Sequence, residues 1–178
     1  LAGMVVHQTR NELYVVDRNE PDVFVFDSTT YQLMDHWQLE TGAWGIDLLG
    51  DVLYVTDNTN IVSYYDIDTK SLLGTFDTGQ TAVGIAVSEQ PFHAAFTTGF
   101  SDHSLLVKYD LDTGARDEVQ MNVNGKSTGV TIDSTTGYVY AICSDDIHVI
   151  DGMTMTILNT YPVGFGWSPT DCLVSTIE

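Results

Sequence analysis

Acidic and amide side chains are the residues of this chain that could do chemistry, and they gather in loops that follow short apolar runs. Two tryptophans lie in loops that lead into further apolar runs. The candidate ligand-binding residues are Asp17, Trp44, Asp57, Asn58, Asp102, His103, Asp145, Asp146 and Trp167. Carboxylate and amide oxygens are the ligands that hard cations such as Ca²⁺ prefer. A calcium site is therefore one interpretation of this set, and solvation with turn capping is the one we favour.

The chain contains no recognisable catalytic motif. It lacks a Gly-x-Ser-x-Gly nucleophile elbow, a P-loop, a dinucleotide-binding fingerprint and an EF-hand loop. Its five histidines show neither HxH nor HxxxH spacing. We expect structural roles for His93 and His148, which fall in predicted strands, whereas His103 stands beside Asp102 in a long loop. No catalytic residue is assigned on these grounds, and no cofactor is expected beyond the calcium alternative.

The elements that position these loops repeat along the chain. Short apolar runs that open on glycine recur every 39 to 45 residues, at Gly3, Gly45, Gly84 and Gly129, and a degenerate copy starts at Asp171. A period of this length with several short strands per unit is typical of propeller blades, because one unit cannot bury both of its faces alone. We therefore predict an all-β fold, a β-propeller of four-stranded antiparallel blades.

One propeller domain, or a portion of one, is expected over residues 1–178. The predicted blades span about 3–44, 45–83, 84–128 and 129–170, and residues 171–178 start the next blade. Propellers have 4–8 blades, and four blades plus the first strand of a fifth are an awkward count for a ring. We expect a part of a larger ring of about seven blades. The alternative is a ring that closes with a second copy of the chain.

Each unit is expected to contain four short strands rich in Val, Ile, Tyr, Phe and Thr. The second strands of three units carry a tyrosine at one position, Tyr14, Tyr54 and Tyr140. In the third unit we place the second strand at Phe92–Phe96, with His93 in place of the tyrosine. This alignment predicts that the four residues occupy equivalent places in their blades.

The turn between the third and fourth strands carries Asp-x-x-Thr in all four units, starting at Asp27, Asp66, Asp110 and Asp151. An aspartate at the first position of a turn accepts hydrogen bonds from backbone N–H groups two or three residues further on, and the threonine hydroxyl adds another local bond. Because the motif recurs at an equivalent hairpin in every unit, we interpret these aspartates as turn residues and not as metal ligands or acids.

The second strands, together with the period and the Asp-x-x-Thr turn, resemble the YVTN-type β-propeller repeat of surface-layer and YVTN-family proteins. The closest match is Leu53–Asn58 (LYVTDN), and the resemblance covers nearly the whole chain, with His93 and a longer loop as departures in the third unit. It implies an extracellular, cell-surface or periplasmic protein. It implies little about activity, because binding modules and some enzymes share this architecture.

A strong negative charge limits the partners of this chain. The sequence has 25 acidic and 6 basic residues, which gives a formal net charge of −19. Nucleic acid is excluded as a partner, because its binding requires neutralisation of phosphates by Lys and Arg. Cations, basic partners or a salty medium are favoured. No apolar run is long enough to predict a membrane-spanning helix.

The two cysteines match neither a metal-binding nor a haem-attachment motif. Cys143 ends a second strand, and Cys172 lies in the innermost strand expected one unit later. We expect Cys172 to be a small buried hydrophobic residue. A disulfide between the two cysteines remains the alternative.

Two hypotheses for function follow. The first is a non-catalytic binding or scaffold module that recognises a protein or glycan partner through its loop rim, together with further blades or self-association. The second is a part of a propeller enzyme, such as a lyase, lactonase or redox subunit, with its active site in other blades or at the channel mouth. A convergent His/Glu/Asp cluster that holds a metal would favour the second.

Overall fold

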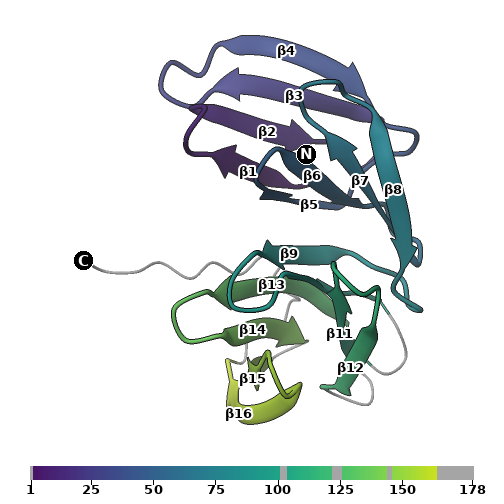
Figure 1. Cartoon of the computed structure of the whole chain (residues 1–178), viewed down its shortest axis with the longest axis vertical. Helices are drawn as coiled ribbons and strands as arrows, with labels where there is room; N and C mark the ends of the chain where they lie inside the picture. Colours follow the sequence, from purple (N-terminus) through teal and green to yellow (C-terminus); the bar gives the residue numbers. More distant parts are fainter. Residues whose placement is uncertain (1, 101–103, 122–125, 144–145, 164–178) are drawn as a thin grey trace.

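The computed structural model describes residues 2–100, 104–121, 126–143 and 146–163, and these form sixteen strands in four antiparallel sheets (Figure 1). Blade 1 consists of β1 (Met4–His7), β2 (Glu12–Val16), β3 (Asp22–Asp27) and β4 (Leu33–Gln38). Blade 2 consists of β5 (Gly45–Leu49), β6 (Val52–Thr56), β7 (Ile61–Asp66) and β8 (Leu72–Asp77). The described residues include no helix that could cross a membrane.

The second half of the chain repeats this arrangement. Blade 3 consists of β9 (Gly84–Ser88), β10 (Ala94–Thr98), β11 (Leu105–Asp110) and β12 (Arg116–Gln120). Blade 4 consists of β13 (Ser127–Asp133), β14 (Tyr138–Cys143), β15 (Asp146–Asp151) and β16 (Thr156–Pro162). Within every sheet the strands lie in sequence order and each strand pairs with the next. This confirms the predicted all-β fold of four-stranded antiparallel propeller blades.

The four blades follow an arc with their first strands on the inside (Figure 1). β1 contacts β5, β5 contacts β9, and β9 contacts β13. The strands β1 and β13, at the two ends of this series, share no extensive contact. The described part of the chain is therefore an open segment of a propeller. The strand predicted at Asp171–Thr176, and with it Cys172, lies outside the described residues.

Three apolar layers hold neighbouring blades together. Between blades 1 and 2, Trp37 packs against Tyr65 with 5.7 Å between ring centroids, and Leu53 is fully buried. Between blades 2 and 3, Phe76 stacks on Tyr109 at 4.0 Å. A third layer joins Phe96 and its neighbours in blade 3 to blade 4. Full burial of one such side chain stabilises the fold by about 1.5–3 kcal/mol, so adjacent faces of two blades depend on one another.

The prediction that His93 takes the tyrosine position of blade 3 is wrong. In blade 2, Tyr54 pairs with Asp47 of the innermost strand. In blade 3, Phe96 makes the corresponding pair with Ala86, so Phe96 is the residue equivalent to the tyrosine. His93 instead lies in the β9–β10 hairpin with φ of 46°, and its backbone N–H donates to Glu89 O. The second strand begins at Ala94, two residues later than predicted, and the tyrosine position moves by three residues, because two small alanines and not bulky residues open the strand.

The Asp-x-x-Thr motifs are turn residues, as the repeat pattern indicated. In the four predicted motifs the aspartate Oδ1 accepts backbone N–H groups two and three residues further on, at 2.7–3.1 Å. A fifth copy, not singled out from the sequence, begins at Asp133 in the β13–β14 hairpin. In all five copies the residue four places after the aspartate has a positive φ, at Tyr31, Lys70, Gly114, Gly137 and Met155.

Candidate functional site

The inner strands of the four blades line a central channel. A cavity of about 260 Å³ lies there, and the glycines that open β5 and β9 are among its lining residues. A Cβ atom on Gly45 would approach Val83 O to 2.4 Å, and one on Gly84 would approach Thr128 O to 2.5 Å. These distances are too short for a side chain, so the recurrent glycines let neighbouring blades approach closely at the channel.

The loops around the channel mouth contact one another. The segments that enter blades 2, 3 and 4 each donate a backbone N–H to the loop that follows the second strand of the preceding blade. Ala43 N–H donates to Asp17 O at 3.3 Å, and Ala82 N–H donates to Thr59 O at 2.6 Å. Ser127 N–H donates to Gly99 O at 3.3 Å. These contacts fix the loops of successive blades to one rim.

Two of the candidate carboxylates on this rim are bound to local donors. Asp17 Oδ1 accepts the Asn19 N–H at 2.9 Å. Asp57 Oδ1 accepts both the N–H and the hydroxyl of Thr59, at 3.0 and 2.6 Å, and its Oδ2 accepts the Thr41 hydroxyl at 3.1 Å. Both aspartates therefore cap their turns. No group of three or more His, Cys, Asp or Glu that could hold a metal occurs among the described residues.

The remaining candidates are distributed as follows. Asn58 is exposed and adopts a left-handed conformation with φ of 64°, which asparagine tolerates well. Asp146 begins β15 and pairs with Cys143 and Pro162. Trp44 lies half-buried at the channel mouth. Four candidates lie outside the described residues: Asp102, His103, Asp145 and Trp167.

At the channel mouth the structure brings together two aromatic rings and two cations, which we call the rim aromatic row: Arg18, Trp44, Phe100 and Lys126. The Trp44 and Phe100 rings meet edge to face, with centroids 5.8 Å apart and planes at 89°. The Arg18 guanidinium lies 5.5 Å from the Trp44 ring, and the Lys126 ammonium lies 5.3 Å from the Phe100 ring. Contacts of this kind stabilise by about 0.5–1 kcal/mol at exposed sites.

Each member of the rim aromatic row comes from a different blade or its entry loop. Arg18 follows β2, Trp44 precedes β5, Phe100 follows β10, and Lys126 precedes β13. The sequence identified Trp44 as a candidate and missed Phe100. The feature that could have identified Phe100 is its position: it is a large aromatic residue at the start of the long loop after β10, just beyond a run of buried residues. The row places two of the six basic residues of this acidic chain on one rim.

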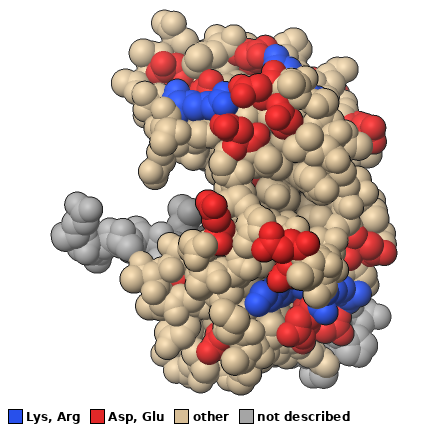
Figure 2. Space-filling model, in the orientation of Figure 1, with Lys and Arg blue, Asp and Glu red and all other residues tan. Residues whose placement is uncertain are grey.

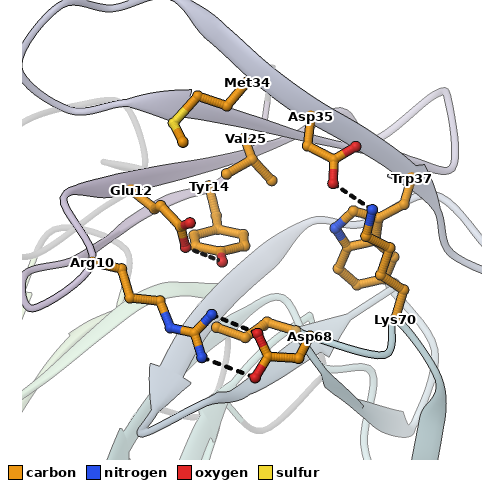
Figure 3. A pocket seen from close by; sticks show the side chains of 10 residues that line it. Arg10, Glu12, Tyr14, Val25, Met34, Asp35, Trp37, Asp68 and Lys70 are labelled. Atoms are coloured by element: carbon orange, nitrogen blue, oxygen red, sulfur yellow. Dashed lines mark hydrogen bonds and ion pairs between the residues drawn. The ribbon is translucent and has the colours of Figure 1, made fainter.

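A second hollow, of about 370 Å³, lies between blades 1 and 2 at the opposite ends of the strands (Figure 3). Arg10 reaches across it from the β1–β2 hairpin and binds Asp68 with two nitrogens, at 2.6 and 3.0 Å, and Asp51 at 2.6 Å. Lys70 binds Asp35 across the same hollow. We name this hollow the interblade crevice.

Both cations of the interblade crevice bind aspartates. The hydrogen bond from Arg10 lowers the pKa of Asp68, and the hydrogen bond from Lys70 lowers the pKa of Asp35. Tyr14 donates its hydroxyl to Glu12 at 2.7 Å, and burial followed by this bond raises the pKa of the phenol. Because both cations already bind aspartates of the neighbouring blade, the crevice acts as a clamp between blades 1 and 2.

On the visible face, acidic side chains form more areas than basic ones, and the basic ones occupy only a few small areas (Figure 2). Basic side chains on that face lie next to acidic ones (Figure 2). Ion pairs of this kind join Arg10 to Asp68 and Arg116 to Glu118. In the rim aromatic row the two cations lie against aromatic rings.

Comparison with known proteins identifies the fold. No protein-family model and no curated protein matches the chain. Among solved structures, hydrazine synthase from Kuenenia stuttgartiensis matches 90% of the chain with a TM-score of 0.74 and 14% identity. The β-propeller domain of Cps50 (Swd1) from Myceliophteria thermophila matches 96% with a TM-score of 0.72 and 13% identity. The chain spans 48% and 59% of these two proteins, respectively. At such identities the likeness shows the propeller fold alone.

Proposed function

We propose that this chain is a non-catalytic binding propeller that holds a protein or glycan partner through its channel-mouth rim. The observation that carries this proposal is the rim aromatic row, in which four loops far apart in sequence deliver Arg18, Trp44, Phe100 and Lys126 to one line. Trp and Arg are the residue types that most often dominate the binding energy of protein interfaces. Aromatic rings also supply large contact area at a small cost in conformational entropy.

The rim also has the rigidity that a binding surface needs. The entry loops are joined to the preceding blades by the backbone bonds of Ala43, Ala82 and Ser127. Asp57 binds Thr41 and Thr59 and so connects two loops of the same rim. A surface that is ordered before binding loses less conformational entropy on association.

We further propose that the chain is a YVTN-type repeat protein that works outside the cell, at its surface or in the periplasm. The support for this assignment is the LYVTDN segment at Leu53–Asn58, which folds as β6 and its following turn, and the Asp-x-x-Thr turns of all four blades. An acidic surface suits a basic partner or a salty medium.

Binding of the labelled protein to a glycan array and a peptide array tests the proposal. We expect a ligand that the wild-type protein retains and that Trp44→Ala binds at least tenfold more weakly, with a smaller loss for Arg18→Ala. Leu73→Ala is the matched control, because Leu73 is a half-exposed apolar residue on β8, away from the rim. A ligand held equally by Trp44→Ala and the wild type would contradict the proposal, as would the absence of binding on both arrays.

A further inference from the structure

In the described part of the chain, the same interface between blades occurs three times, and its two halves are each present without the other at the ends of the arc. Each interface joins an exit face of one blade to an entry face of the next. In blade 1 the exit face contains Tyr14, Val25 and Trp37, which are 3, 6 and 7% exposed. They pack on the entry face of blade 2, where Leu53 and Tyr65 are 0 and 4% exposed.

Among the described residues, no blade covers the entry face of blade 1. The register of β2 and β3 places Leu13 and Phe26 of blade 1 at the positions that Leu53 and Tyr65 occupy in blade 2. Instead of being buried they line an open, almost wholly apolar hollow of about 430 Å³, together with Val15, Phe24 and Tyr31. Tyr31 is 74% exposed. This hollow therefore has the side chains of an interface without the second blade.

Blade 4 presents the other half. In blade 1, the buried Trp37 of β4 pairs with Val23 of β3. In blade 4, Tyr161 of β16 makes the corresponding pair with Ile147 of β15, so Tyr161 is equivalent to that tryptophan. It is 52% exposed. Tyr140 and Val149, the equivalents of Tyr14 and Val25, are half-buried. The described exit face of blade 4 thus carries aromatic and aliphatic side chains that in blade 1 are covered.

We propose that the entry face of blade 1 binds the exit face of blade 4 of a second copy of this chain. The two faces carry the complementary halves of an interface that the chain already forms three times. An entry face is therefore expected to pair with an exit face, and not with a second entry face. The named residues of both faces carry no charge, although the chain has a net charge of −19. The contact is therefore apolar, and screening of the surrounding acidic groups by salt strengthens it.

Two copies joined in this way form a closed assembly. A contact between unlike faces generates either a ring or an open filament, depending on whether the rotation closes. Two four-bladed arcs supply eight blades, which is within the 4–8 blades of known propellers. In that ring the entry face of blade 1 and the exit face of blade 4 of each copy are both covered.

Light scattering coupled to size-exclusion chromatography, together with sedimentation velocity, tests this proposal on the full chain at 0.15 M NaCl. We expect a species of about twice the 19.6 kDa chain mass. Phe26→Asp, which alters the entry face, and Tyr161→Asp, which alters the exit face, should each weaken the association at least 100-fold. Leu73→Asp is the control, because it adds the same charge to an exposed residue of β8.

A mixture of the two variants distinguishes the proposed pairing from others. Phe26→Asp still has an intact exit face and Tyr161→Asp an intact entry face, so an equimolar mixture should regain one intact interface and form a two-chain species. Pairing of two like entry faces would leave Tyr161→Asp dimeric and would contradict the proposal. A wild-type monomer at 0.2 mM would contradict it as well, and so would filaments of indefinite mass.

Circular dichroism shows whether each variant is folded. Should Phe26→Asp unfold, Tyr31→Asp alters the same face at a residue that is 74% exposed and carries no core packing. Dimerisation of folded Tyr31→Asp with unchanged affinity would overturn the assignment of the entry face.

Discussion

At the scale of single residues, most polar side chains of this protein serve the fold. The turn aspartates accept backbone N–H groups, and these bonds lower the pKa values of Asp27, Asp66, Asp110 and Asp151. One exception is His148 of β15, which is 3% exposed. Its Nδ1 binds the Thr160 hydroxyl at 3.0 Å, and its Nε2 has no hydrogen-bond partner among the described residues. Burial lowers the pKa of this imidazole from its ordinary value of 6.5, and Asp146 opposes that shift.

We expect His148 to make the protein less stable as the pH falls below about 6.5. The unfolded chain takes up a proton at its ordinary pKa, whereas the folded chain resists it until a lower pH, so the free energy of unfolding decreases over this interval. Above pH 6.5 the contribution of the neutral imidazole is complete. Urea denaturation of the wild type between pH 7.5 and 5.5 measures the effect.

The control for His148 is His148→Leu, which removes the titrating group and keeps an apolar side chain of similar size. It should show a smaller loss of stability over the same pH interval, because the variant has no buried imidazole at this position. An equal loss in both proteins would show that burial of His148 does not cause the pH dependence.

At the scale of elements, the sequence predicted the strands well where bulky residues repeat and poorly where they do not. Tyr14, Tyr54 and Tyr140 occupy equivalent positions of β2, β6 and β14, as their patterns indicated. In β10 the small side chains of Ala94 and Ala95 gave no such signal, and the tyrosine position falls to Phe96. Contacts between loops, such as Trp44 on Phe100, depend on how the blades are arranged in space, which no local pattern specifies.

The turn after β11 should depend on glycine. Gly114 has φ of 71°, a conformation that side chains disfavour. Gly114→Ala should therefore lower the free energy of unfolding by about 1 kcal/mol. Gly114→Asn is the matched variant, because asparagine tolerates this conformation, and it should lose about half as much. Equal stability of Gly114→Ala and the wild type in urea denaturation would contradict this explanation of the turn.

The layer between blades 1 and 2 should be sensitive to truncation. Leu53 of β6 is fully buried there, so Leu53→Ala should cost about 2–5 kcal/mol through lost burial and a residual cavity. Leu73→Ala removes the same atoms from a residue that is 50% exposed and should change stability by less than about 0.5 kcal/mol. A similar cost for both substitutions would mean that this layer does not hold the blades together.

At the scale of the whole molecule, charge opposes the compact state and apolar layers maintain it. The chain carries 25 acidic and 6 basic residues, and the ion pairs of Arg10, Lys70 and Arg116 use three of the basic ones. The period of the repeat was sufficient to predict the propeller, because every blade needs neighbours on both faces. It was not sufficient to predict the rim aromatic row, whose members belong to four separate loops.

Salt should stabilise the protein because of this imbalance. Between about 10 mM and 0.5 M NaCl the Debye length falls from about 30 Å to a few Å, and repulsion between acidic groups is screened. The midpoint of thermal unfolding should rise over this range, at a protein concentration low enough to keep single chains. Differential scanning fluorimetry measures it, and a flat or falling midpoint would show that repulsion does not limit stability.

The central claim is that the rim aromatic row binds the partner, and the indole N–H signal of Trp44 in a two-dimensional NMR spectrum tests it most directly. The spectrum is recorded during titration with the ligand obtained from the arrays, and Trp44→Phe assigns the signal. We expect the Trp44 signal to shift with the ligand, while that of Trp37, which is 7% exposed in the layer between blades 1 and 2, stays in place. A bound ligand that leaves the Trp44 signal unchanged would contradict the account.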